Sequence, residues 1–176
     1  MSFLKGEEIV RRKIVNVEDS KQIQPCSVEL IFEEIHKFTE DPECLEPFIG
    51  AILRDKTYFS KECYKLAKLT PTQLYVEDQL RIGYYLNEGF YIITLQEVRM
   101  LKNCFGILTH RSSVQRLLAI PKATIIDPAY HGKPKVLVYV KYPIFIEEKA
   151  RLFHLVVYCS EEEFKEYQGQ YQHESL

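Results

Sequence analysis

From residue 79 onward, hydrophobic and polar positions alternate in short runs that are typical of half-buried β-strands. The runs are rich in β-branched and aromatic residues, and turn-forming residues separate them, as at Asn87-Glu88-Gly89 and Gly132-Lys133-Pro134. The pattern predicts strands at 80–86, 90–95, 104–109, 136–142 and 152–158. Several short strands at this spacing favour an antiparallel sandwich or barrel over alternating β-α-β units.

The first 78 residues give a weaker pattern. Residues 1–15 predict a short amphipathic helix, because two glutamates lie near its start and Arg11, Arg12 and Lys13 near its end, which suits the helix dipole. The alternation at 26–32 predicts a strand. We expect an irregular excursion at 37–60, one or two helical turns at 61–69, and a polar tail at 161–176 that is flexible unless it closes over a ligand.

Composition narrows the class of protein. The chain has 176 residues, enough for one domain with a proper core, and a formal net charge of −2. This charge gives no electrostatic footprint for nucleic acid or for an acidic membrane, so neither partner is expected. The sequence contains no apolar run of 18 residues and no apolar signal core at its start. We therefore expect a soluble, cytoplasmic protein.

Cysteine and histidine usage argues against metal chemistry held by the protein. The five cysteines are scattered, odd in number and form no C-x-x-C pair, so neither a disulfide framework nor a structural zinc site is expected. The H-x-E and P-C-x-x-C motifs of zinc-dependent nucleobase deaminases are absent. We assign no metal to His110, His131 or His154, because a lone histidine on a β segment is more often a packed or surface residue.

The segment HRSSVQR is the first candidate for substrate binding. Arg111 and Arg116 supply forked cationic donors, and Ser112 and Ser113 between them supply short hydroxyl donors, a combination suited to a polyphosphate. The alternative is structural: Arg111 pairs with a carboxylate and the serines cap a helix. Spacing alone does not decide between the two interpretations.

The segment IIDPAYHG is the second candidate. Asp127 follows an apolar strand, and partial burial there would suit a general base or an acceptor for a substrate hydroxyl. Tyr130 offers a flat face for stacking. The alternative is an Asx-type turn, in which Asp127 caps its own backbone before Gly132.

Six segments, in this order, resemble the dCTP deaminase / dUTPase superfamily over nearly the whole chain. They are MSFLKGEEI, IQPCSVEL, YYLNEGFYIITLQEVRMLKNCFGILTHRSSVQR, KATIIDPAYHG, ARLFHLVVY and EYQGQ. The resemblance implies a mostly β fold, a distorted antiparallel β-barrel with a short N-terminal helix over residues 1–160, followed by a tail at 161–176. It also implies a homotrimer with sites between subunits and a deoxyuridine or deoxycytidine triphosphate bound as its Mg²⁺ complex.

The resemblance further implies roles for individual residues. Arg111, Ser112 and Arg116 would contact or organise the triphosphate, with Ser113 beside them. Asp127 would lie at the sugar and the attacking water, with Tyr130 beneath the deoxyribose. We expect Asp127, Arg116 and Ser112 to carry catalysis.

Two further groups complete the expected site. The backbone around Lys122 and Ala123 would read the pyrimidine edge. Tyr167 and Gln170 would close over the ligand from the tail.

One departure from the family pattern bears on the reaction. Deaminase members carry a catalytic glutamate in the strand after the Ile-Asp-Pro block, and here that strand reads KVLVYVKYP. The aligned position is Val138, or Leu137 if the register slips by one, and no acid occurs between Asp127 and Glu147. Losing a general acid or base typically costs about 10²–10⁴-fold in rate. Family-type deamination is therefore not expected.

Hydrolysis of the triphosphate needs a different set of groups, which the chain retains: a carboxylate that orients water, and cationic donors. We therefore expect a dUTP diphosphatase that forms dUMP and pyrophosphate with Mg²⁺. A dCTP deaminase that uses another acid stays open, as does an inactive deoxynucleotide-binding relative. Departures that favour the inactive alternative are His110 and Thr124 at glycine positions, His154 at a glutamine, Glu29 at an aspartate and Glu166 at a lysine.

Overall fold

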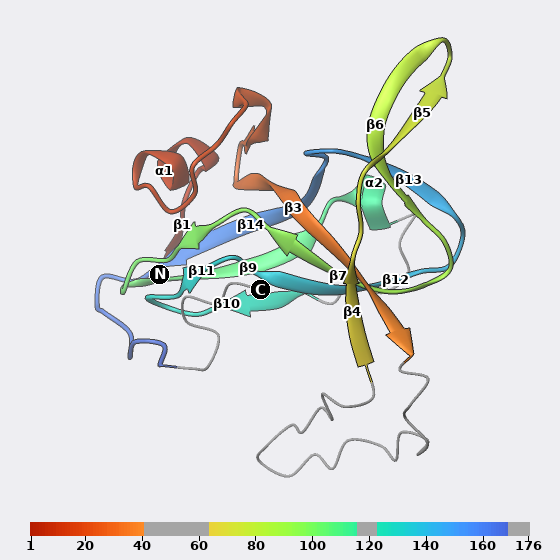
Figure 1. The fold of residues 1–176 in the computed structure, drawn as a ribbon. Coiled ribbons are helices and arrows are strands. Elements are labelled where there is room, and N and C mark those ends of the chain that lie inside the picture. Colours follow the sequence, from red (N-terminus) through yellow and green to blue (C-terminus); the bar gives the residue numbers. More distant parts are fainter. Residues whose placement is uncertain (41–63, 116–122, 169–176) are drawn as a thin grey trace.

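An antiparallel sheet that curls into a half-barrel forms most of the structure (Figure 1). The structure is a computed structural model and describes residues 1–40, 64–115 and 123–168. Six strands follow one another across it in the order β10-β9-β14-β3-β7-β12. Their bounds are Thr124–Ile126 (β10), Cys104–His110 (β9), Arg151–Cys159 (β14), Ser27–Glu40 (β3), Gly89–Leu95 (β7) and Lys135–Val140 (β12). The mostly β fold expected from the sequence is confirmed.

Shorter elements complete this sheet and cover one end of it. Strands β1 (Ser2–Phe3), β2 (Ile23–Gln24) and β4 (Tyr64–Lys68) pair with β14, β3 and β3, respectively. The helix α1 (Gly6–Arg11) packs against β2 and β3, and a 3-10 turn, η1 (Ser20–Gln22), precedes β2. Two further short strands, β8 (Val98–Arg99) and β11 (His131–Gly132), pair with each other.

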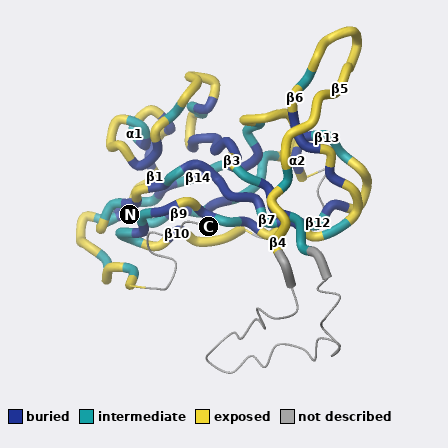
Figure 2. Tube along the Cα trace, viewed as in Figure 1, coloured by how far each residue is buried: buried dark blue, intermediate teal, exposed yellow. Residues whose placement is uncertain are grey.

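The third sheet carries a hairpin that projects from the body. Strand β6 (Gln79–Leu86) pairs with β5 (Thr72–Val76) on one side and with β13 (Ile144–Glu147) on the other. The turn between β5 and β6 has Glu77 and Asp78 in the left-handed region, with φ of 50° and 60°. The whole of β5 is exposed, as the yellow tube in Figure 2 shows.

The hydrophobic core lies where the strands of the main sheet alternate inward. Along β14, Leu152, Leu155 and Val157 are buried, and along β12, Val136, Val138 and Val140 are buried. The dark blue stretches of Figure 2 follow these strands. Because alternate residues of a strand face opposite sides, the remaining residues of β12 face outward, where the candidate site lies.

The strand predictions from residue 79 onward agree with β6, β7, β9, β12 and β14 to within two residues. The expected N-terminal helix is shorter than predicted, because residues 2–3 pair with β14 instead. The strand predicted at 26–32 continues to Glu40, and the rest of the expected excursion at 37–60 lies outside the described residues.

Two expectations are wrong. Residues 61–69 were expected to be helical, but 64–68 form β4, because the extended β3 offers an edge with which they pair, from His36↔Lys68 to Glu40↔Tyr64. Tertiary pairing of this kind overrides a weak local preference. Against the expectation of no disulfide framework, Cys104 and Cys159 are disulfide-bonded, since they are direct partners in the β9–β14 register.

Cys26 is exposed and carries a free thiol. In the described part of the chain, no helix has the length and apolar character needed to cross a membrane.

Candidate functional site

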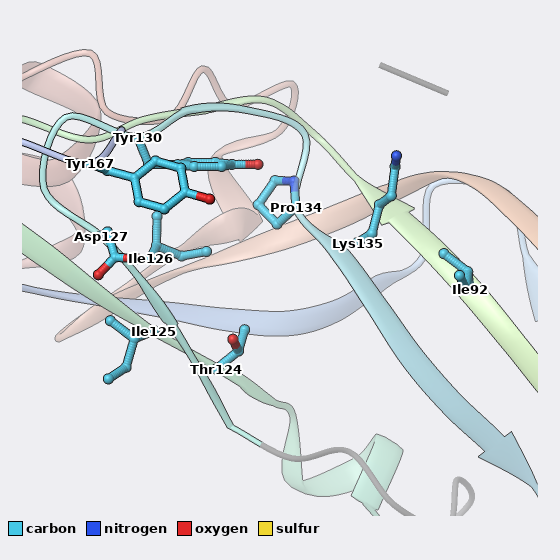
Figure 3. A pocket seen from close by; sticks show the side chains of 9 residues that line it. All are labelled: Ile92, Thr124, Ile125, Ile126, Asp127, Tyr130, Pro134, Lys135 and Tyr167. Carbon is cyan, nitrogen blue, oxygen red and sulfur yellow. The ribbon is translucent and has the colours of Figure 1, made fainter. Parts of the chain in front are cut away.

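A cavity of about 390 Å³ lies at the end of β10, where the chain turns after the Ile-Asp-Pro segment (Figure 3). The turn is held by two backbone hydrogen bonds: Tyr130 N donates to Asp127 O at 3.1 Å, and Met100 N donates to Tyr130 O at 2.7 Å. Ala129, between them, has a φ of 62°. The lining residues are Ile92, Thr124, Ile125, Ile126, Asp127, Tyr130, Pro134, Lys135 and Tyr167.

Asp127 is exposed, which corrects the expectation of partial burial. Its neighbour Ile126 enters the core while Ile125 is 63% exposed, because adjacent residues of β10 face opposite sides. The carboxylate therefore stands at the mouth of an apolar cavity rather than inside it. There it can meet a water molecule and a polar ligand together.

The start of the tail meets this cavity within the same chain. Tyr167 N donates a hydrogen bond to Pro128 O at 3.0 Å, and the rings of Tyr130 and Tyr167 lie 6.0 Å apart at an angle of 59°. Figure 3 shows the two rings together above Asp127. The structure thus brings Tyr130 and Tyr167 together, and their role in binding a nucleotide stays a prediction.

Glu166, which stands where the family pattern resembled by the sequence has a lysine, forms an ion pair. Lys102 Nζ lies 2.6 Å from its Oε1. This contact raises the pKa of Lys102, since the carboxylate of Glu166 stabilises the ammonium form. An unpaired anion at this position would repel a substrate phosphate, and the ion pair with Lys102 reduces that repulsion.

A second cavity, of about 530 Å³, continues from the first along the outer face of β7 and β12. Thr124 and Lys135 line both cavities. The remaining lining residues of the second cavity are Phe90, Ala123, Val136, Leu137 and Tyr139. No acid is among the described residues that line it.

Strand β12, which lacks the acid of the family pattern, has one face toward the core and one toward the second cavity. Val138 is fully buried and faces the core, whereas Leu137 is 53% exposed and lines the second cavity. The β12 residues that line the second cavity are Lys135, Val136, Leu137 and Tyr139, and none of them carries a carboxylate. Both positions considered from the sequence, 137 and 138, lack a titratable group.

Tyr139 has an acidic partner nearby. Its hydroxyl donates a hydrogen bond to Glu88 Oε1 at 2.5 Å, and Lys141 Nζ lies 3.1 Å from the same oxygen. The hydrogen bond from Tyr139, supported by Lys141, lowers the pKa of Glu88 and keeps it ionised near neutral pH. The sequence motifs did not indicate that Lys135 and Thr124 line the cavities, or that Tyr139 pairs with Glu88. The alternation in KVLVYV could have found Lys135, because it puts 135, 137 and 139 on one face.

Arg111 takes part in a different cluster at the far end of β9. Its Nε lies 2.8 Å from Oε1 of Glu29, and its Nη1 donates to Arg151 O at 3.0 Å. Arg151 Nη1 lies 2.8 Å from Oε2 of Glu29, a carboxylate of which only 4% is exposed. The alternative that Arg111 pairs with a carboxylate is thus what the structure contains. Glu29 stands at the position at which the family pattern resembled by the sequence has an aspartate.

His154 completes the cluster. Its Nδ1 lies 3.1 Å from Ser27 Oγ, and its Nε2 lies 3.9 Å from Glu29. Burial lowers the pKa of His154, and the nearby carboxylate of Glu29 only partly opposes this effect. At neutral pH the ring is therefore uncharged, and Glu29 is balanced by the two arginines.

The described chain does not bring Arg111 and Asp127 together. Strands β9 and β10 are antiparallel with Gly106 opposite Ile126, so Asp127 lies beside the start of β9 and Arg111 beyond its end. At about 3.3 Å per residue, the six positions from 105 to 111 separate them by roughly 20 Å. Ser112 and Ser113 lie exposed in α2 (Ser112–Gln115), on the Arg111 side.

The remaining predicted site residues are placed as follows. Ala123 is exposed and lines the second cavity. Arg116, Lys122 and Gln170 lie outside the described residues. Across residues 1–40, 64–115 and 123–168, no group of three or more histidine, cysteine or acidic side chains is placed to hold a metal ion.

Comparison with known proteins finds similarity both to a curated sequence and to a solved structure, while no family model matches the chain. Over 72 residues, 40% of its length, the chain is 33% identical to a deoxyuridine 5'-triphosphate nucleotidohydrolase of Methanocaldococcus jannaschii. The fold is similar to that of the crystal structure of 2'-deoxycytidine 5'-triphosphate deaminase from Agrobacterium tumefaciens, with a TM-score of 0.57, 15% identity and 88% of this chain covered. The chain spans about half the length of each, 46% in both cases.

Proposed function

We propose a function from the premise that the chain belongs to the dCTP deaminase / dUTPase superfamily, whose fold it has and whose sequence it shares in part. The chain hydrolyses dUTP to dUMP and pyrophosphate, with Asp127 as the base. One observation carries the proposal: an exposed carboxylate stands at a cavity beside two tyrosines and Lys135, while the described lining of the adjoining cavity contains no acid for deamination.

The mechanism assigns Asp127 to the attacking water. Its carboxylate accepts a proton from water as the oxygen attacks the α-phosphorus, and the bond to the bridging oxygen breaks to release pyrophosphate. Tyr130 supports the sugar, and Tyr167 covers it from the tail. Lys135 lies between the two cavities, where its ammonium can face an anionic substrate.

The metal fits this site as part of the substrate. Mg²⁺ commonly binds through one or two carboxylates together with substrate phosphates, and Asp127 is the one acid among the described residues that line the cavity. When bound on the triphosphate, Mg²⁺ would neutralise the charge that develops on the leaving pyrophosphate. The chain itself contributes the carboxylate and the lining of the cavity.

The roughly 20 Å that separate Arg111 from Asp127 lead us to propose that a second copy of the chain completes the site. Arg111 of one copy would face Asp127 of another, which suits the homotrimer expected from the family resemblance. Glu29 holds Arg111 at its Nε and Arg151 O holds it at its Nη1, while 29% of the Arg111 side chain is exposed, where it can meet a phosphate oxygen. Ser112 and Ser113 would reach the triphosphate from the same copy.

The test measures the products of dUTP and of dCTP side by side with Mg²⁺ present. We expect pyrophosphate from dUTP, a rate at least about 10²-fold lower for Asp127→Asn, and no ammonia from dCTP. The matched control is Asp78→Asn, which removes a carboxylate in the β5–β6 turn. If unsubstituted protein releases no pyrophosphate, or Asp127→Asn does not slow the reaction, the proposal is wrong.

An inactive relative that only binds a deoxynucleotide is the second candidate. The engagement of Arg111 by Glu29 and Arg151 favours it, because fewer of its donors are left for a triphosphate. Calorimetry with a non-hydrolysable dUTP analogue would then detect binding, while unmodified dUTP would not be turned over.

A further inference from the structure

The start of the tail is attached to its own subunit by a set of contacts that lies outside the cavities. Ser160 N donates to Asn103 O at 2.8 Å, and Asn103 Nδ2 returns a bond to Ser160 O at 3.0 Å. Phe164 N then donates to Lys102 O at 3.0 Å. The tail therefore follows the turn at 101–103 for several residues before it reaches the site.

Side chains strengthen this attachment. The Phe164 ring meets Phe105 edge to face, with centroids 6.0 Å apart, and Phe105 stacks on Tyr158. Lys102 pairs with Glu166 directly before Tyr167. We define the contacts of Lys102 with Glu166 and of Phe105 with Phe164 as the tail latch.

The same turn also supports Asp127. Ala129 N donates to Leu101 O at 3.4 Å, and Tyr130 O accepts from Met100 N. One short segment, 100–103, thus contacts both the turn that carries Asp127 and the tail that carries Tyr167. Anything that fixes the tail on this segment also fixes Tyr167 relative to Tyr130.

We propose that Lys102 and Glu166 are positioning residues, which hold Tyr167 over the Asp127 cavity of the same chain through the tail latch. The importance of this position for substrate rests on the proposed function; the attachment itself does not. Glu166 thus has a role in this chain that differs from contact with phosphate, since its carboxylate faces Lys102. The negative charge of Glu166 compensates the positive charge of Lys102.

The first experiment measures amide hydrogen exchange at Tyr167 in the full chain without nucleotide. The rate is expressed as a protection factor, relative to the exchange rate of an unstructured chain of the same sequence, because substitution of the neighbouring residue 166 also changes that reference rate. The variants are Lys102→Glu, Glu166→Lys and the double exchange of both charges. Both side chains are about half exposed, so we expect each single variant to lower protection about two- to five-fold, and the double variant to restore it. Lys149→Glu is the control, because it breaks a similarly exposed pair with Glu18 away from the tail.

The second experiment measures dUTP hydrolysis by the same proteins. We expect the single variants to raise KM about two- to five-fold with kcat little changed, and the double variant to return to the original KM. Unchanged protection in the single variants, or no recovery in the double variant, overturns the latch. Altered protection with unchanged KM overturns its positioning role. If unsubstituted protein does not hydrolyse dUTP, the proposed function fails, and hydrogen exchange alone decides the latch.

Discussion

At the scale of single residues, Glu29 is the most consequential charge in the described chain. Its buried carboxylate lies 2.8 Å from both Arg111 and Arg151, and Oε2 accepts no hydrogen bond of good geometry. We expect Glu29→Gln to lower the free energy of unfolding by about 3 kcal/mol, since it leaves two partly buried guanidinium groups without a counter-charge. Urea denaturation measures this. Glu18→Gln, which breaks an exposed pair, should cost less than about 1 kcal/mol. Equal losses in both variants would contradict the prediction.

His154 gives the same cluster a dependence on pH. Because burial lowers its pKa below the ordinary 6.5, the unfolded chain binds a proton first as the pH falls, and the free energy of unfolding decreases from about pH 6.5 downward. Glu29 opposes the shift, while Arg111 and His110 reinforce it. Urea midpoints between pH 7.5 and 5 should therefore decline less steeply in His154→Gln. The contribution of Glu34, whose pKa Lys68 lowers, is lost only below about pH 4.5 and does not overlap this range. Identical slopes in the two proteins would rule the effect out.

At the scale of elements, Gly83 sets how closely β6 and β13 can approach. A Cβ there would lie 2.3 Å from Ile146 O and 2.8 Å from Glu147 Cα, and backbone atoms cannot turn away as a side chain can. We expect Gly83→Ala to lower the free energy of unfolding by about 1–3 kcal/mol. The control is Gln73→Ala, an exposed position on the neighbouring β5, which should change it by less than about 0.5 kcal/mol. If Gly83→Ala does not change the free energy of unfolding, β6 and β13 can move apart without losing stability, and the prediction is wrong.

The pairing of each strand also decides whether it could be predicted from the sequence. Alternation along 104–109 and 152–158 identified strands because one face of each is buried, so the residues themselves carry the pattern. Strand β4 was not predictable in this way, since its conformation depends on the edge that β3 offers. The Cys104–Cys159 disulfide likewise follows from strand register, which 55 residues of separation do not reveal.

The candidate site shows a similar division. The order of motifs identified Asp127, Tyr130 and Tyr167, and the structure brings these three together. Arg111 lies only sixteen positions before Asp127 in the chain, yet an antiparallel strand pair carries the two to opposite ends. The family resemblance implied sites between subunits, and a site that joins Arg111 to Asp127 of another copy stays a prediction.

At the scale of the whole molecule, the distance between Arg111 and Asp127 allows a site shared between two copies to be tested by mixing two inactive variants. Arg111→Gln and Asp127→Asn should each be inactive toward dUTP alone. If the site joins Arg111 of one copy to Asp127 of the next, equal amounts of both variants, unfolded and refolded together, should assemble at random and leave about one site in four with both native residues. We therefore expect about a quarter of the original activity in the mixture. If Arg111 and Asp127 of the same chain acted together, mixing would restore none, because every chain carries one of the two substitutions. Denaturation of each variant alone checks that Arg111→Gln, which also disturbs Glu29, still folds.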